Sequence, residues 1–154
     1  MFKILFATIP AGIRRYVFAP LVPVLVFAGC AHRGDVARSG EIQNIELVSG
    51  TKSWDGTKLP PYPRGQPEVT VRRFVIPPGA SLPMHKHPVI NAGVLIRGNL
   101  EVVKKGGPTK TLKAGDALIE MVDLWHYGRN PGRVPAEIVV VYAGTPGVPT
   151  SVLH

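Results

Sequence analysis

The sequence predicts an all-β domain built as a sandwich or a barrel. Its 154 residues include 17 Gly and 16 Pro, so about one residue in five interrupts regular structure. Roughly seven or eight short runs of apolar and β-branched residues alternate with turn signals such as Gly-Asn and Asn-Pro-Gly. No stretch keeps the helical period of about 3.6 residues over several turns. These observations favour short strands over helices.

The start of the chain predicts export. Within residues 1–29, basic residues precede an apolar run at 16–29, which has the length of a secretory signal and is short for a spanning helix. Ala28 and Gly29 then precede Cys30, the single cysteine. This run resembles the lipobox of bacterial lipoproteins, which implies cleavage before Cys30 and lipidation of its thiol. A plain signal peptide or an uncleaved anchor is the alternative. We expect an exported protein of the cell envelope or periplasm, anchored to a membrane by lipid.

The rest of the chain divides into a tether and a barrel. Residues 30–44 have little apolar content and predict a flexible tether, and the barrel domain is expected over residues 45–148. Residues 50–67 are rich in Gly and Pro and predict a long loop or an edge element. A change in alternation at Arg72 and Arg73 predicts a bulge. The predicted strands cover residues 45–48, 68–76, 89–96, 100–103, 109–112, 117–122 and 137–143.

The charge of the chain bears on the class of partner. The formal net charge of +8 comes from 18 Lys and Arg against 10 Asp and Glu. These basic residues are scattered, whereas a nucleic-acid-binding surface needs a clustered basic stripe with interleaved aromatic residues. We therefore expect no nucleic-acid partner.

Residues 85–91, HKHPVIN, have the composition of a metal site. His85, His87 and Asn91 are spaced by even numbers, so a regular strand would project all three side chains to one side. His126 is a further candidate. Neutral imidazoles suit a divalent Zn, Fe, Mn, Ni or Cu ion, and three histidines leave coordination positions open, as in catalytic sites. We therefore expect one divalent metal ion in the domain.

Two spaced motifs resemble those of the cupin superfamily, over roughly residues 72–143. The first motif, G-x5-H-x-H-x3-N-x6-G, contains Gly79, His85, His87, Asn91 and Gly98, and the second, G-x10-H-x3-N, contains Gly115, His126 and Asn130. The resemblance implies a double-stranded β-helix, a small jelly-roll barrel, with the histidines lining its interior near one mouth. It also implies that a homodimer is plausible. The three glycines are assigned to turns, and positive φ is expected at Gly98 and Gly115.

The chain departs from the cupin pattern at three positions. Cupins normally have Glu where Asn91 stands, and Pro and Gly where Met121 and Asp123 stand. Asn91 either ligates weakly through its amide oxygen or hydrogen-bonds a ligand or a histidine. In either case we expect weaker metal binding than a Glu would provide.

The resemblance leaves the activity open. A metal-binding cupin binds or transforms a small molecule, and as an enzyme it would be of oxygenase or isomerase type. The alternatives are a non-catalytic small-molecule binding or sensor module and a structural dimer without metal. No catalytic residue is identified from the sequence. Glu120 either acts as an acid or base or faces solvent.

Overall fold

The computed structural model describes residues 40–154 of the chain. The predicted signal peptide and Cys30 lie outside the described residues, so export and lipidation stay predictions. Within the part that is described, no helix is long and apolar enough to cross a membrane.

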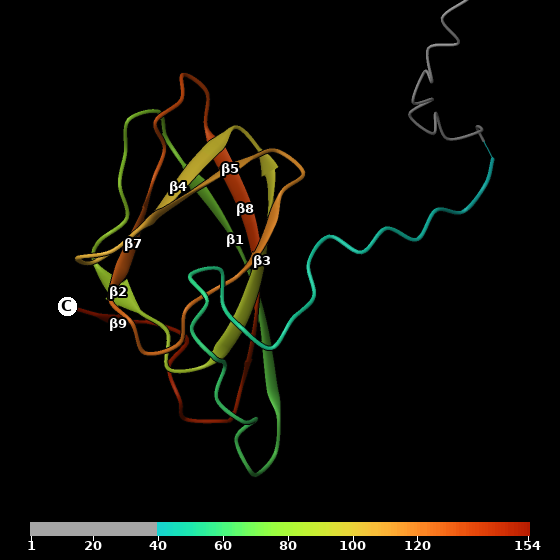
Figure 1. Ribbon diagram of the computed structural model, residues 1–154, viewed down its shortest axis with the longest axis vertical. Coiled ribbons are helices and arrows are strands. Elements are labelled where there is room, and N and C mark those ends of the chain that lie inside the picture. Colours follow the sequence, from blue (N-terminus) through green and yellow to red (C-terminus); the bar gives the residue numbers. More distant parts are fainter. Residues whose placement is uncertain (1–39) are drawn as a thin grey trace, which may run out of the picture. The chain divides into compact units, whose positions relative to one another are not determined.

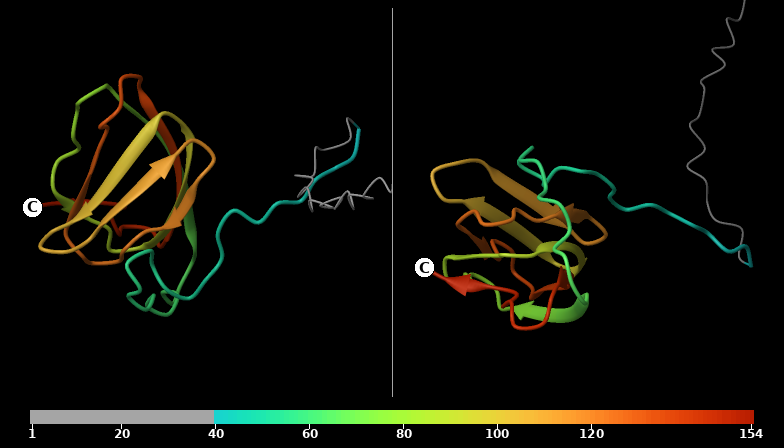
Figure 2. Two further views of the ribbon diagram at one scale, coloured as in Figure 1. Left: turned by 45° about the horizontal axis from the view of Figure 1, so that its top comes forward. Right: turned by 90° about the horizontal axis from the view of Figure 1, so that it is seen from below.

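Nine strands within residues 40–154 form two antiparallel sheets. One sheet has the order β1 (Glu68–Ile76), β8 (Ala136–Gly144), β3 (Ile90–Arg97) and β6 (Ala117–Ile119). The other has the order β5 (Thr109–Lys113), β4 (Asn99–Lys104), β7 (His126–Arg129), β2 (His85–Lys86) and β9 (Val152–Leu153). The sheets face one another (Figure 1), and β4 and β5 run side by side as an antiparallel pair (Figure 2). The prediction of an all-β fold is confirmed, and the arrangement is that of a double-stranded β-helix.

The core lies between the sheets because side chains alternate along each strand. In β3, Asn91, Gly93 and Leu95 are buried, while the residues between them are more exposed. Leu95, Leu112 and Leu118 are at most 1% exposed. Full burial of one such leucine contributes about 1.5–3 kcal/mol, so the apolar interior holds the two sheets together.

The predicted bulge in β1 is wrong. β1 pairs with β8 in one continuous register from end to end, through Arg72 and Arg73. The change in alternation has another cause, because Val69, Val71 and Val75 lie on the outer face and are more than half exposed. The apolar residues on the outer face therefore produced a sequence pattern like that of a strand with a bulge, although the strand is regular.

Other differences concern short or unpaired segments. Residues 45–48 form no strand and are exposed, because an apolar run forms a strand only when a neighbour pairs with it. The structure adds β2, β7 and β9, which were not predicted as strands. They contain only two to four residues, too few for a pattern of alternation to show.

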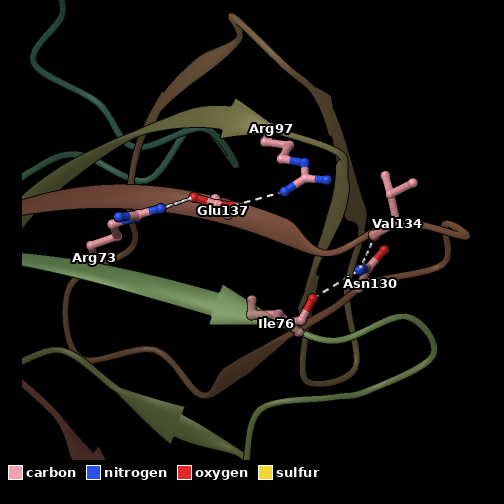
Figure 3. A network of polar contacts seen from close by, with 6 residues as sticks. All are labelled: Arg73, Ile76, Arg97, Asn130, Val134 and Glu137. Atoms are coloured by element: carbon pink, nitrogen blue, oxygen red, sulfur yellow. Dashed lines mark hydrogen bonds and ion pairs between the residues drawn. The ribbon is translucent and has the colours of Figure 1, made fainter.

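A polar cluster joins the strands at one end of the first sheet. The carboxylate of Glu137 lies between the guanidinium groups of Arg73 and Arg97 (Figure 3). The hydrogen bond from Arg73 lowers the pKa of Glu137, with a further contribution from Arg97. Both arginines remain more than half exposed, so these ion pairs orient side chains more than they stabilise the fold.

Two of the turn glycines provide a matched test of the backbone. Gly98 and Gly115 have φ of 74° and 94°. A Cβ at Gly98 would lie 2.6 Å from the Pro135 carbonyl oxygen, whereas one at Gly115 would meet nothing within 4 Å. We expect Gly115→Ala to lower the free energy of unfolding by about 1 kcal/mol, through the strain of the left-handed backbone alone. Gly98→Ala should cost ~1–3 kcal/mol more than Gly115→Ala, because the backbone at Pro135 must move to make room for the added Cβ. Urea unfolding measures both losses, and equal losses would contradict the close approach.

Candidate metal centre

The chain changes sheets inside the HKHPVIN run. His85 lies on β2 in one sheet, and Asn91 lies on β3 in the other. Pro88 stands at the crossing, where it has no N–H to donate to a ladder. The run is therefore not one regular strand. His85, His87 and Asn91 nevertheless line one cavity, because the two sheets face each other across it.

Three histidines from two parts of the chain meet at this cavity. His85 is paired with His126 across β2 and β7, and their ring centroids are 4.6 Å apart. The ring of His87 lies 4.9 Å from that of His85 and 5.0 Å from that of His126. One ring nitrogen from each residue lies within 4.8 Å of the others, a grouping that could hold a metal ion. We call these three residues the histidine cluster.

Backbone carbonyls orient all three rings in the same way. The Nδ1–H group of His85 donates to the Pro83 carbonyl at 2.7 Å. The corresponding group of His87 donates to Thr150 at 2.7 Å, and that of His126 to Leu124 at 2.8 Å. A carbonyl only accepts, so each Nδ1 carries the proton and each Nε2 keeps its lone pair. In this arrangement a hydrogen bond from Nδ1 fixes the ring and leaves Nε2 free to bind a metal ion.

Burial keeps the histidine cluster neutral. Burial lowers the pKa of His85 and that of His126. The pKa of His87 falls to about 4 through burial, with a smaller contribution from the other two rings. Metal ligands must be deprotonated, so at neutral pH no proton has to leave an imidazole before an ion binds.

Several buried polar atoms around the cavity have no hydrogen-bond partner within residues 40–154. They are His126 Nε2, Asn91 Oδ1, Glu120 Oε2 and Trp54 Nε1. The side-chain amide of Asn91 donates from Nδ2 to the Val89 carbonyl at 3.3 Å. Its Oδ1 is therefore the atom of this side chain that has no hydrogen-bond partner in the described structure. Such atoms are costly unless something satisfies them. An imidazole nitrogen beside carboxylate and amide oxygens is a ligand set that a divalent cation accepts, so His126, Asn91 and Glu120 fit a metal ion. The indole N–H of Trp54 can only donate a hydrogen bond and is no ligand.

The cavity beside the histidine cluster has a volume of about 220 Å³. Most ligand pockets measure roughly 300–1,000 Å³, so this one suits a small ligand. Its walls are mostly apolar, with Phe74, Leu82 and Val140 among them. Of the residues that the structure describes, Arg72 is the only lysine or arginine that lines it. Tyr142 also lines it, with its ring 5.5 Å from that of His87.

Three further polar residues near the histidine cluster differ in whether they line the cavity. Glu120 does not face solvent: it is buried beside the cavity, and burial raises its pKa to about 7. Asp123, where cupins have Gly, has a φ of 55°, a conformation that Asp tolerates better than most residues. Lys86 forms an ion pair with Asp123 at 3.1 Å and does not line the cavity.

Sequence reasoning missed the contribution of the C-terminal segment. Thr150 orients His87, Ser151 lines the cavity, and Leu153 on β9 pairs with His85. These residues follow position 148, where the predicted barrel ended. No local motif indicated their role, because it depends on the long-range pairing of β2 with β9.

The motif and the geometry agree with a comparison against protein families. Residues 72–142 match the family model described as a cupin domain. This part of the chain is similar to a cupin domain. The matched residues include His85, His87, Asn91 and His126.

Solved structures similar to this chain include enzymes. The DMSP lyase DddQ from Ruegeria pomeroyi DSS-3 is 24% identical over 55% of this chain and 42% of its own, with a TM-score of 0.49. An oxalate oxidase in complex with glycolate is 26% identical over 55% of this chain and 45% of its own, with a TM-score of 0.48. The chain therefore spans less than half the length of either protein. No curated protein matches the chain significantly.

Proposed function

We propose that the cupin domain holds one divalent metal ion through the Nε2 atoms of His85, His87 and His126, and that it binds or transforms a small molecule in the adjoining cavity. The observation that carries this proposal is the common orientation of the histidine cluster. Each Nδ1 is occupied by a backbone carbonyl, so each imidazole offers Nε2 as its ligand atom. The rings are also kept neutral by burial.

The chain's own residues define what the cavity accepts. When bound, the ion would supply a Lewis acid with open coordination positions. The apolar walls, including Leu100 and Ile138, exclude water from a ligand and strengthen electrostatic interactions there. Arg72 brings a cation to the same cavity, where its planar guanidinium suits a carboxylate or a similar anionic group. The preferred ligand is therefore a small molecule with one anionic group.

Metal content tests the proposal. The full chain would be purified without a polyhistidine tag, incubated in turn with Zn, Fe, Mn, Ni and Cu, and measured by mass spectrometry. We expect close to one ion per chain in the parent and in the control variant His154→Ala, which changes an exposed histidine. The double variant His85→Ala/His126→Ala should lose the ion. A parent chain that takes up none of the five metals would overturn the proposal.

A further inference from the structure

We propose that Glu120 supplies the metal centre with the carboxylate that Asn91 lacks. The ligand set would then be three histidines and one carboxylate, with the carboxylate carried directly after β6 instead of on β3. This inference rests on the proposed metal binding by the histidine cluster.

Asn91 and Glu120 are direct neighbours across the first sheet. The backbone N–H of Glu120 donates to the carbonyl of Asn91 at 3.0 Å, next to the paired residues Ala92 and Ile119. Residues opposite each other in an antiparallel pair project to the same face. Both side chains accordingly line the cavity. A carboxylate at position 120 is therefore displaced from position 91 by only one strand spacing, about 4.8 Å.

Glu120 also reaches the histidine cluster. Its Oε2 lies 3.7 Å from His126 Nε2. Two ligand atoms that are each about 2.0–2.1 Å from one metal ion lie roughly 3–3.5 Å apart. A side-chain movement of a few tenths of an ångström would therefore bring the carboxylate oxygen to ligand distance. Both atoms lack hydrogen-bond partners among the described residues.

No lysine or arginine of the described chain neutralises this buried carboxylate. Within residues 40–154, the only basic side chain that lies within 4.0 Å of the Glu120 carboxylate is that of His126, and burial keeps this ring neutral. Lys104 is held by Asp55, with 2.6 Å between Nζ and Oδ2. A buried carboxylate is costly unless it is protonated, paired with a cation or bound to a metal. A divalent ion between Glu120 and the histidine cluster would satisfy this requirement and the unpartnered nitrogen together.

The first test measures Zn²⁺ affinity of the full chain by competition with a chelating indicator. Glu120→Gln keeps the shape of the side chain and removes its charge, and we expect at least a tenfold loss of affinity. The matched control is Glu101→Gln, because Glu101 pairs with Arg129 and alternates with the buried residues Leu100 and Val102 on β4. The control removes the same charge away from the cavity and should bind Zn²⁺ as the parent does.

The second test moves the carboxylate back. The exchange Asn91→Glu/Glu120→Asn keeps one carboxylate and one amide at the two positions, and we expect it to recover most of the tenfold loss. A failure to recover affinity in a folded exchange variant would overturn the ligand assignment. If that variant does not melt cooperatively, the visible spectrum of the Co²⁺-loaded Glu120→Gln chain decides. A spectrum identical to the parent's would also overturn the assignment.

The two proposals fail in different ways. Unchanged Zn²⁺ affinity in Glu120→Gln, with loss in His85→Ala/His126→Ala, would overturn the role of Glu120 and leave the histidine site standing. A parent chain that binds no metal would overturn both.

Discussion

His126→Ala should lower the affinity of the full chain for Zn²⁺ at least ~100-fold and abolish the rise in melting temperature that Zn²⁺ produces. The loss of partners that only orient a metal ligand costs about 10–100-fold in affinity, so loss of a ligand itself should reach or exceed that range. An ion present at 100 times its dissociation constant stabilises a folded protein by about 2.7 kcal/mol. Calorimetric melting with and without Zn²⁺ measures this difference directly.

The metal-free variant should remain folded. His126 is 1% exposed, and its Nε2 has no hydrogen-bond partner in the described structure, so truncation removes an unsatisfied buried polar atom together with the packing of the ring. The loss of packing and the relief of the unsatisfied atom oppose each other. The control is His154→Ala, for which the shift with Zn²⁺ should match that of the parent. An equal shift in His126→Ala would contradict its role as a ligand.

Asn130→Ala should lower the free energy of unfolding by about 3 kcal/mol. Asn130 is 1% exposed and joins three backbone groups. Its Nδ2 donates to the carbonyls of Ile76 and Val134, at 2.9 and 2.8 Å (Figure 3), and its Oδ1 accepts from the N–H of Gly132 at 2.8 Å. Each buried group left without a partner costs about 1–3 kcal/mol. The estimate takes the lower part of that range because Val134 is exposed and can bond water.

Urea unfolding measures this loss, and Asn99→Ala is the matched control. Asn99 is exposed and lies beside the same loop, with its amide nitrogen 3.6 Å from the Cβ position at Gly132. We expect a change within about 0.5 kcal/mol for the control. Asn130→Asp should also be destabilising, because a carboxylate cannot donate to the carbonyl of Ile76. A variant Asn130→Ala as stable as the parent would show that the loop does not depend on these bonds.

The strand pattern was accessible from the sequence where strands were long and had one apolar face. β3, β4, β5 and β8 were predicted to within two residues at each end, and β1 with its observed bounds, because burial between two sheets requires alternating side chains. The pattern misled at Arg72 and Arg73, where exposed valines on the outer face hid the alternation. It could not find β2 and β9, because two-residue strands exist only through the strands beside them.

The spacing of residues along the chain by itself determined which side chains are candidates for metal binding, and the turns between strands determined an all-β fold. Only the tertiary structure decided which of these side chains meet at one cavity and how their rings are oriented. The crossing at Pro88 puts His85 before it and Asn91 after it in facing sheets, while His87 lies between them outside the named strands. The pairing of Glu120 with Asn91 brings in a carboxylate that no motif contained. Thr150, more than sixty positions away from His87, fixes the tautomer of that ring. Such contacts depend on long-range strand pairing, and the free energy that selects one pairing comes from burial of the whole interior, which no short stretch of sequence contains.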